Sequence, residues 1–340
     1  MGKVNWGRVE KALERERHRM IWRPYGLPNV GSPTTSVFVD EVIQPPWRVP
    51  DRMLVSVAIT GAFLMPTDNP DQPITVDQIR DEAIACAGDG ASTIHIHVRD
   101  DNGYNTLSLE RFAAVISPLR EQYPDLAVDG CLVPALDGEW DEMRRVLESG
   151  LLDAVPVNTT ATYVGDALFA KPIPVILEKT RLVREAGAKV IIACYVDGDI
   201  SNADRFLFKS GLVESPSYWL ILPALPGCSP MANPRQMADG LLRMSSAIYD
   251  VDPYATVMVC AAGRASTWLV ALAASLGLHI RVGMEDTLWR WPHREDKITS
   301  NRVMLGAAKD IGALLGRQIA SHAEYRSMVG MQDARSSLSV

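Results

Sequence analysis

An alternation of two kinds of segment begins at Leu54 and continues through most of this chain. Short segments rich in apolar and β-branched residues predict buried strands, and a longer segment with the pattern of a helix follows each of them. Eight such units follow one another, which indicates parallel strands joined by helical crossovers. The predicted fold is therefore a closed (β/α)8 TIM barrel. A doubly wound open sheet is the alternative, although no G-x-G-x-x-G follows the first predicted strand.

The predicted barrel occupies residues 51–318 and is followed by an expected C-terminal tail, residues 319–340. The predicted strands cover residues 54–60, 92–97, 126–132, 153–158, 189–195, 218–223, 256–261 and 279–283. The predicted helices cover residues 75–87, 108–122, 139–148, 175–186, 202–209, 234–246, 266–276 and 297–315.

The first 50 residues have a different composition and predict an N-terminal arm. A charged amphipathic helix is expected over residues 3–20, and a stretch rich in Pro, Gly and Trp without periodicity follows it. Because three tryptophans lie in this arm, we expect it to bury them against the body or against a neighbouring subunit. We therefore expect a homo-oligomer.

Composition and charge argue against several classes of protein. The 340 residues are 47% hydrophobic and 22% charged, which is typical of a globular protein. A net charge of −7 without a long basic run argues against a nucleic-acid partner, and no apolar run is long enough to predict a membrane span. The five cysteines are scattered and form no C-x-x-C, so we expect reduced thiols and a cytoplasmic location.

Two histidines, His95 and His97, lie on the second predicted strand with Ile96 between them. Side chains alternate across a strand, so both imidazoles lie on one face, about 6–7 Å apart. At that separation two imidazoles can chelate one metal ion. The alternative is a pair of core histidines with hydrogen-bond partners, but the Arg99-Asp100 that follows favours a metal site.

Other polar side chains lie where further predicted strands end, and in a barrel these ends meet at one mouth. Asn158 ends the fourth strand, Arg281 lies on the eighth, and Glu285 and Asp286 follow the eighth. The eighth strand closes next to the first, so Glu285 can reach a metal ion held by the two histidines. Two histidines and a glutamate with a water molecule form a known catalytic zinc site. The alternative for Glu285 and Asp286 is a solvated acidic pair.

Arg281 and Asp286 are the candidate catalytic residues of this cluster. The planar guanidinium of Arg281 suits a substrate carboxylate, and its alternative is an ion pair with Asp286 or Glu285. Asp286 can serve as a general base.

Cys131, Tyr195 and Gly263-Arg264 also follow predicted strands. Cys131 is either a thiol of the pocket or a buried structural cysteine, and Tyr195 either lines the site or packs. Gly263-Arg264 is either a phosphate contact at a helix N-terminus or, through Arg264, a surface ion pair.

Four short motifs together resemble the β-keto acid cleavage enzyme family over roughly residues 54–315. They are Thr60-Gly61-Ala62, His95-Ile96-His97-Val98-Arg99-Asp100, Pro226-Gly227 and Arg281-Val282-Gly283-Met284-Glu285-Asp286. The resemblance implies a zinc-dependent (β/α)8 barrel that acts on a small β-keto acid. Such an enzyme condenses this acid with acetyl-CoA and releases acetoacetate and a new CoA ester.

The resemblance also implies a role for particular residues of this chain. Zinc would be held by His95, His97 and Glu285, while Arg281 and Asp286 match the active-site arginine and the catalytic acid/base. The expected substrate-binding residues are Thr60, Phe63, Cys131, Asn158, Ala193 and Tyr195. Gly227 and Gly263 are expected beside acetyl-CoA, because the Pro226-Gly227 loop resembles the segment that meets the acyl-CoA; its alternative is a tight turn.

Several polar residues of the family are replaced in this chain. Phe63 lies where the family has a glutamate, and Ile191 and Ala193 replace two further glutamates. Residues 131–134 read Cys-Leu-Val-Pro in place of Ser-Thr-Gly-Gly, and Pro156 replaces a threonine. We therefore expect an apolar pocket and a substrate with a less polar tail than an amino-substituted acid. Hydrolytic retro-Claisen cleavage of a 1,3-dicarbonyl without CoA, and a non-catalytic metal- or ligand-binding barrel, are the alternative functions.

Overall fold

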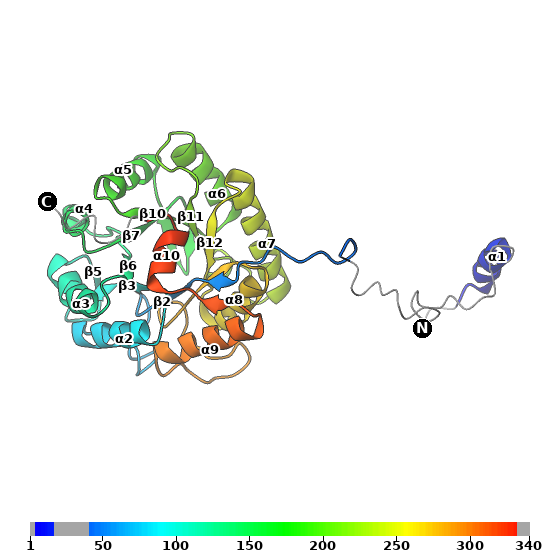
Figure 1. The fold of residues 1–340 in the computed structure, drawn as a ribbon, viewed down its shortest axis with the longest axis horizontal. Helices are drawn as coiled ribbons and strands as arrows, with labels where there is room; N and C mark the ends of the chain where they lie inside the picture. Colours follow the sequence, from blue (N-terminus) through cyan, green and yellow to red (C-terminus); the bar gives the residue numbers. More distant parts are fainter. Residues whose placement is uncertain (1–3, 17–40, 332–340) are drawn as a thin grey trace. The chain divides into compact units, whose positions relative to one another are not determined.

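Eight parallel strands close into a barrel in the computed structural model of this chain, which describes residues 4–16 and 41–331 (Figure 1). In order around the barrel, the strands are β2 (Val55–Ala58), β3 (Thr93–Ile96), β6 (Ala127–Gly130), β7 (Ala154–Asn158), β10 (Lys189–Cys194), β11 (Tyr218–Ile221), β12 (Thr256–Val259) and β13 (His279–Val282). The last strand pairs with the first, through Arg281 and Ser56 among others. The predicted TIM barrel is confirmed.

A helix follows each of these strands and covers the outside of the barrel. These helices are α2 (Val76–Gly88), α3 (Leu109–Gln122), α4 (Glu139–Glu148), α5 (Ile173–Glu185), α6 (Asp197–Ala203), α7 (Pro234–Val251), α8 (Ser266–Ser275) and α9 (Asn301–Leu314).

Three of the helices differ from the predicted bounds by four or five residues at one end. Helix α6 begins five residues early because the Asp199 carboxylate accepts hydrogen bonds from the Tyr195 and Val196 N–H groups, and a π-helical turn, Asp204–Phe208, follows it. Helix α7 continues five residues further, to Val251. Helix α9 begins at Asn301 instead of residue 297, because Lys297 forms a β-bridge with Trp289.

Side chains of the barrel strands alternate between two apolar layers. Those that point outward, such as Val57, Ile94 and Ile192, pack with the surrounding helices in the larger hydrophobic cluster. Those that point inward, such as Leu54 and Ile191, form a second cluster inside the barrel. This inner layer fills the amino-terminal part of the barrel, so polar side chains are concentrated at the carboxyl ends of the strands.

The amino-terminal end of the barrel is closed by the segment that we expected to be a C-terminal tail. Strand β14 (Gln318–Ile319) pairs with β1 (Arg52–Met53), and helix α10 (His322–Met328) follows it. Figure 1 shows α10 across the centre of the ring of helices, where Tyr325 and Val329 join the inner cluster. The expected tail is therefore wrong for residues 319–331, because apolar side chains of α10 cover the open end of the barrel.

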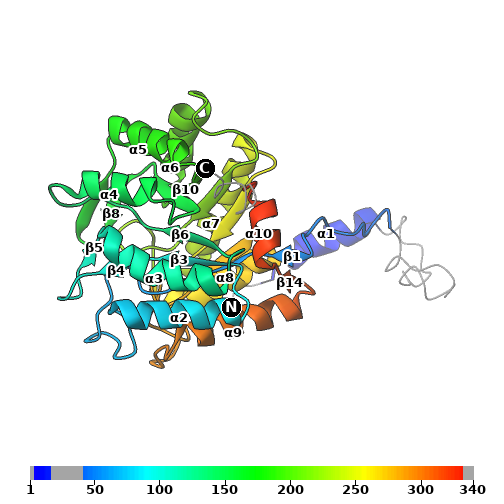
Figure 2. The same ribbon diagram turned by 60° about the vertical axis from the view of Figure 1, so that its left-hand side comes forward.

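Two antiparallel hairpins lie at the opposite end of the barrel (Figure 2). One consists of β4 (Val98–Arg99) and β5 (Asn105–Thr106), directly after β3. The other consists of β8 (Ala161–Val164) and β9 (Ala167–Ala170), directly after β7. Both hairpins extend the walls of the mouth at which the predicted site lies.

The N-terminal arm is a separate unit, residues 1–48, and the barrel unit begins at Val49. Its helix α1 (Trp6–Glu16) leaves the side chains of Trp6, Val9 and Leu13 exposed. The rest of the expected helix over residues 3–20 lies outside the described residues, as does most of the Trp-rich stretch. Among the described helices, none is both long and apolar enough for a membrane span.

Replacing Tyr325 by alanine tests whether α10 stabilises the barrel. The Tyr325 ring is fully buried and packs edge-on against Tyr218 at a centroid distance of 6.2 Å. We expect Tyr325→Ala to lower the free energy of unfolding by about 3–5 kcal/mol, as a buried aromatic truncation does. Urea unfolding measures the change. Tyr254→Ala is the control, because that ring is 78% exposed and its loss should change stability by less than about 0.5 kcal/mol. Equal effects of the two variants would show that α10 does not hold the barrel.

The contribution of the arm to an oligomer stays a prediction. We expect a chain that begins at Val49 to lose the assembly state of the full chain, because the exposed apolar side chains of α1 are removed. Sedimentation velocity of both chains measures this, and an unchanged assembly state would contradict it.

Candidate active site

His95 and His97 lie on the inner face of the barrel where β3 ends, as their alternation with Ile96 predicts. Both imidazoles are buried, and their ring centroids are 5.3 Å apart. Glu285, which follows β13, brings its carboxylate to the same place. The His95 Nε2 and Glu285 Oε2 atoms are 3.3 Å apart, and His97 Nε2 lies 3.5 Å from Glu285 Oε1. The structure therefore brings the three predicted metal ligands together.

Each imidazole has a second partner on its other nitrogen. The Nδ1–H of His95 donates to the buried carboxylate of Asp129 on β6, and the Nδ1–H of His97 donates to the amide oxygen of Asn105 on β5 at 2.7 Å. These partners accept from the Nδ1–H groups, so each imidazole turns its Nε2 atom toward Glu285, the position from which it can bind a metal ion. The sequence prediction missed both. Asp129 lies two residues before Cys131 on the same predicted strand, so its side chain was expected on the same face, and this alternation could have identified it. No feature of the sequence around Asn105 indicates that it contacts His97.

The two residues after the histidines shape the mouth of the barrel. The buried guanidinium of Arg99 donates to the carbonyl oxygens of Thr60, Leu64 and Gly103, and so connects the loop after β2 to the loop of the β4–β5 hairpin. The Asp100 carboxylate accepts from the Tyr104 N–H at 2.9 Å inside that hairpin turn. Arg99 and Asp100 therefore hold the hairpin that presents an amide to His97.

Two glycines make room for Glu285. Gly283 has a φ of +137°, and a Cβ there would lie 2.2 Å from the Ala58 carbonyl oxygen. Gly61 has a φ of +67°, and its Cβ would lie 2.5 Å from Glu285 Cγ. The close approach lets the Glu285 N–H donate to the Ala58 carbonyl at 3.2 Å across the β13–β2 seam. Glycine at both positions therefore allows the carboxylate to reach the histidines.

The three ligands fit a divalent cation. Their donor atoms all lie within 4.8 Å of one another. The Glu285 Oε2 atom is buried without a hydrogen-bond partner in the described residues, a cost that a bound cation would remove. Burial opposes ionisation of Glu285, but Arg281 and the two histidines hold the pKa of this carboxyl well below its usual value. Two imidazoles and a carboxylate are a typical donor set for zinc.

Arg281 faces the two acidic side chains that follow it. Its Nε donates to Asp286 Oδ2 at 3.1 Å, a second guanidinium nitrogen donates to Asp286 Oδ1, and that nitrogen also lies 3.1 Å from Glu285 Oε1. Burial raises the pKa of Asp286 to about 6, although Arg281 opposes the shift. The ion pair that we considered as the alternative role of Arg281 is therefore present, and the guanidinium orients both carboxylates.

Asn158, Tyr195 and Cys131 line the mouth on the side away from Glu285. The Asn158 amide donates to the Tyr195 hydroxyl at 2.9 Å, so the predicted pair lies together. Burial alone would raise the pKa of the Cys131 thiol, but neighbouring His97 and then Lys179 lower it to about 7. The Cys131 thiol therefore lies beside His97, and its role in the site stays a prediction.

Of three further predicted substrate-binding residues, Thr60 and Phe63 have other surroundings than expected. The buried Thr60 hydroxyl donates to the Pro73 carbonyl oxygen at 2.5 Å and so stabilises the loop after β2. The Phe63 side chain is 78% exposed, because the loop that turns at Gly61 carries it outward, so the expected apolar wall is not formed by its ring. Ala193 is buried inside the barrel next to Asn158 in the register of β10 with β7, as expected.

The two glycines expected beside acetyl-CoA also have structural roles. The Gly263 N–H donates to the carbonyl oxygen of Asp286 at 2.8 Å, so this group is not free for a phosphate. Gly227 has a φ of +92°, and a Cβ there would lie 2.7 Å from the Gly165 carbonyl oxygen in the turn of the β8–β9 hairpin. The Pro226-Gly227 loop therefore packs closely against this hairpin.

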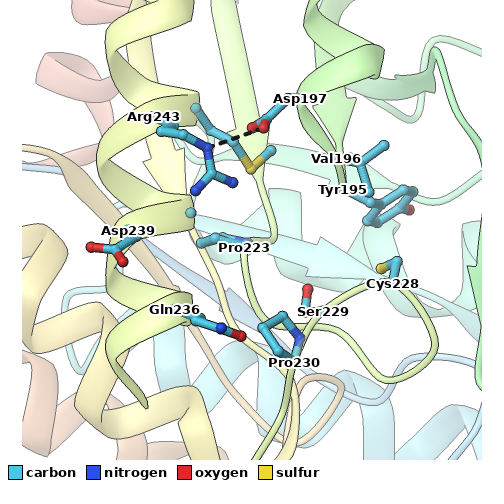
Figure 3. A pocket seen from close by; sticks show the side chains of 12 residues that line it. Tyr195, Val196, Asp197, Pro223, Cys228, Ser229, Pro230, Gln236, Asp239 and Arg243 are labelled. Atoms are coloured by element: carbon cyan, nitrogen blue, oxygen red, sulfur yellow. Dashed lines mark hydrogen bonds and ion pairs between the residues drawn. The ribbon is translucent and has the colours of Figure 1, made fainter. Parts of the chain in front are cut away.

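A pocket of about 370 Å³ lies beside this loop (Figure 3). Figure 3 shows Tyr195 on one side, Cys228 and Ser229 of the loop, and an ion pair between Arg243 of α7 and Asp197 of α6, with 3.2 Å between Nε and Oδ2. Tyr195 lines the pocket and also bonds to Asn158, so the pocket adjoins the mouth of the barrel. Its size is within the range of small-molecule sites.

Two lysines near Cys131 were missed by the sequence prediction. Lys179 of α5 is 5% exposed and donates to the Leu132 carbonyl oxygen at 2.5 Å. Lys171, after β9, is half-buried and lies over the Phe169 ring at 4.5 Å from its centroid. A lysine on an amphipathic helix ordinarily faces solvent, so no local signal marks Lys179 as buried.

Comparisons with known proteins show sequence and fold similarity. A sequence model described as beta-keto acid cleavage enzyme matches residues 52–331. A 3-keto-5-aminohexanoate cleavage enzyme of Fusobacterium nucleatum is 29% identical over 83% of this chain and 99% of its own length. A 3,5-dioxohexanoate:acetyl-CoA acetone transferase of Paraburkholderia graminis is 25% identical over 83% of this chain and 97% of its own. The solved complex of ObcA with oxaloacetate shares the fold, with a TM-score of 0.64 and 17% identity over 77% of this chain and 67% of that one.

Removing ligands or displacing Glu285 tests the metal site. We expect His97→Ala to lose bound zinc and Gly61→Ala to weaken zinc binding by about 10-fold or more, because an added Cβ displaces Glu285. Gly90→Ala is the control, since Gly90 also has a positive φ, +87°, but no atom within 4 Å of an added Cβ. Zinc content by mass spectrometry and competition with a chelator measure the effects. Stoichiometric zinc in purified His97→Ala would contradict the assignment.

Proposed function

Because the chain belongs to the β-keto acid cleavage enzyme family, as its motifs predicted, we propose that it cleaves a carbon–carbon bond of a β-keto acid by acyl exchange with acetyl-CoA. The products would be acetoacetate and a new CoA ester. Relatives whose names specify a cleavage enzyme and an acetyl-CoA-dependent transferase match almost their full length, which supports both parts of the proposal.

One observation carries the proposal: three side chains that could hold a metal ion and a buried carboxylate paired with Arg281 share one mouth. His95, His97 and Glu285 surround one space, and Asp286 is the residue next to Glu285. A β-keto acid has a carbonyl oxygen for a Lewis acid and, one carbon away, an acidic proton for a base. The cluster therefore offers both groups that this substrate class needs.

The three ligands would hold zinc as the resident metal. When bound, zinc would polarise the keto oxygen and stabilise the negative charge that develops on it. Asp129 and Asn105 would keep both imidazoles oriented for this ion through their hydrogen bonds to the Nδ1 atoms.

Asp286 would remove the proton from the carbon between the two carbonyl groups and return it later to the departing product. Arg281 fixes the carboxylate by two hydrogen bonds, so the base has a defined position before the substrate arrives. The carbanion that forms would attack the thioester carbonyl of acetyl-CoA and expel the CoA thiolate. This thiolate would then add to the original keto carbon, and the bond between that carbon and the central carbon would break. The new CoA ester and the carbanion of acetoacetate result, and Asp286 would return its proton to the latter.

The thioester would approach from the side of the Pro226-Gly227 loop. The pocket of Figure 3 adjoins that loop and shares Tyr195 with the mouth of the barrel, which supports an access route there. The backbone N–H of Gly263 is engaged by Asp286, so any CoA contact near this residue would be made by other groups.

A panel of β-keto acids with amino, alkyl and carboxyl tails tests the proposal on zinc-loaded protein. Each acid is incubated with and without acetyl-CoA, and acetoacetate and the new CoA ester are measured by mass spectrometry. We expect both products, in equal amounts, only with acetyl-CoA. Cleavage at the same rate without it would favour the hydrolytic reaction, and no turnover of any 1,3-dicarbonyl would favour a non-catalytic barrel.

Asp286→Asn tests the assignment of the base. The substitution keeps the shape of the side chain and one hydrogen-bond acceptor for Arg281 but removes the proton acceptor. We expect zinc content and fold to be retained and kcat to fall by about 100-fold or more. Asp81→Asn is the control, since that carboxylate is 68% exposed in a surface ion pair with Arg80. Unchanged turnover in Asp286→Asn would place the base elsewhere.

A further inference from the structure

Lys179 is a buried cation with only one described hydrogen bond. Its Nζ atom donates to the Leu132 carbonyl oxygen, one residue after Cys131, at the mouth of the barrel. An ammonium group has three donors, so one carbonyl leaves most of its hydrogen-bonding capacity unused. Burial lowers the pKa of Lys179 to about 8, although the nearby Cys131 thiol opposes the shift.

Lys171 adds a second ammonium group to the same place. The two lysines interact electrostatically with each other, and both interact with the Cys131 thiol. The Lys171 backbone N–H donates to the Thr160 carbonyl oxygen at 2.9 Å, which anchors this residue just beyond Asn158. Its side chain contacts the Phe169 ring, and that ring packs edge-on against Tyr195.

Neither lysine forms an ion pair with a carboxylate of residues 4–16 or 41–331. Two like charges that are partly withdrawn from water destabilise the fold unless an anion joins them. The barrel has carboxylates at its mouth, but Arg281 and the two histidines engage Glu285 and Asp286. The excess of positive charge on the β6–β7 side is therefore open to an anion that arrives from outside.

We propose that Lys171 and Lys179 bind the carboxylate of the β-keto acid, an inference that rests on the proposed function. Arg281, which we first expected in this role, already donates to two carboxylates of the site. Cys131 and Leu132, which follow β6, have no hydroxyl group to receive a carboxylate, and the hydroxyl of Thr159, which follows β7, already donates to the Asp199 carbonyl oxygen. The substrate would then extend from the lysines past Asn158 and Tyr195, with its keto oxygen toward His95, His97 and Glu285.

Binding of a charged and a neutral ligand distinguishes this role from a structural one. Acetoacetate and its uncharged methyl ester are titrated calorimetrically into zinc-loaded protein without acetyl-CoA, so no turnover is required. We expect Lys179→Met to weaken acetoacetate binding by about 10- to 100-fold, the effect of losing a charged hydrogen bond, and to change binding of the ester by less than about 2-fold. Lys209→Met is the matched control, because that lysine is 67% exposed and pairs with Asp204.

Lys171→Met provides an independent test, because it leaves the hydrogen bond from Lys179 to the Leu132 carbonyl oxygen intact. We expect the same selective loss of acetoacetate binding in this variant. Equal weakening of acetoacetate and ester binding would show that the lysines only support the fold. The proposal would also be overturned if the variants bound acetoacetate as tightly as the unmodified protein, or if the unmodified protein did not bind acetoacetate. The two proposals can fail separately. If no β-keto acid is turned over with acetyl-CoA but both variants selectively lose acetoacetate binding, the carboxylate site is supported and the proposed acyl exchange is contradicted.

Discussion

The seam between β13 and β2 is the constraint on which the site depends. The Glu285 N–H donates to the Ala58 carbonyl across it, and glycines at positions 283 and 61 leave the space that this approach needs. The Glu285 carboxylate can therefore meet two imidazoles that belong to a different strand. Metal ligands tolerate errors of only about 0.2 Å in distance, so a small shift of the seam would separate the donors. The closed barrel, whose amino-terminal end is covered by α10, keeps this seam in place.

Charge at the mouth is divided into two groups. On the β13 side, Arg281 and the two histidines balance Glu285 and Asp286, and the Glu285 Oε2 atom has no hydrogen-bond partner among the described residues. On the β6–β7 side, Lys171 and Lys179 form no ion pair with a carboxylate of the described residues, and the Cys131 thiol lies near both. Buried charges are stable only with a partner, so the first group points to a cation and the second to an anion. A small keto acid has groups that suit both sides.

Much of the fold was predictable, because strand and helix periodicities record which side chains face the core. The strand-end rule for barrels also placed His95, His97 and Glu285 together although they are far apart in the chain. The start of α6 was missed because the Asp199 carboxylate caps it from within. Helix α10 was missed because seven residues carry too little periodicity, and its role depends on the open barrel end that it covers.

The sequence by itself determined the fold class, the family and the three metal-ligand candidates, because these depend on residue types and on spacing along one chain. Only the tertiary structure decided which atoms meet. In the structure, Asp129 and Asn105 accept hydrogen bonds from the two histidines, and Arg281 donates to Asp286. The Phe63 ring is exposed, and Lys179 is buried beside Leu132. Contacts of this kind depend on strand register and on the paths of loops between distant segments, and a difference of one residue in either changes the partner of a side chain.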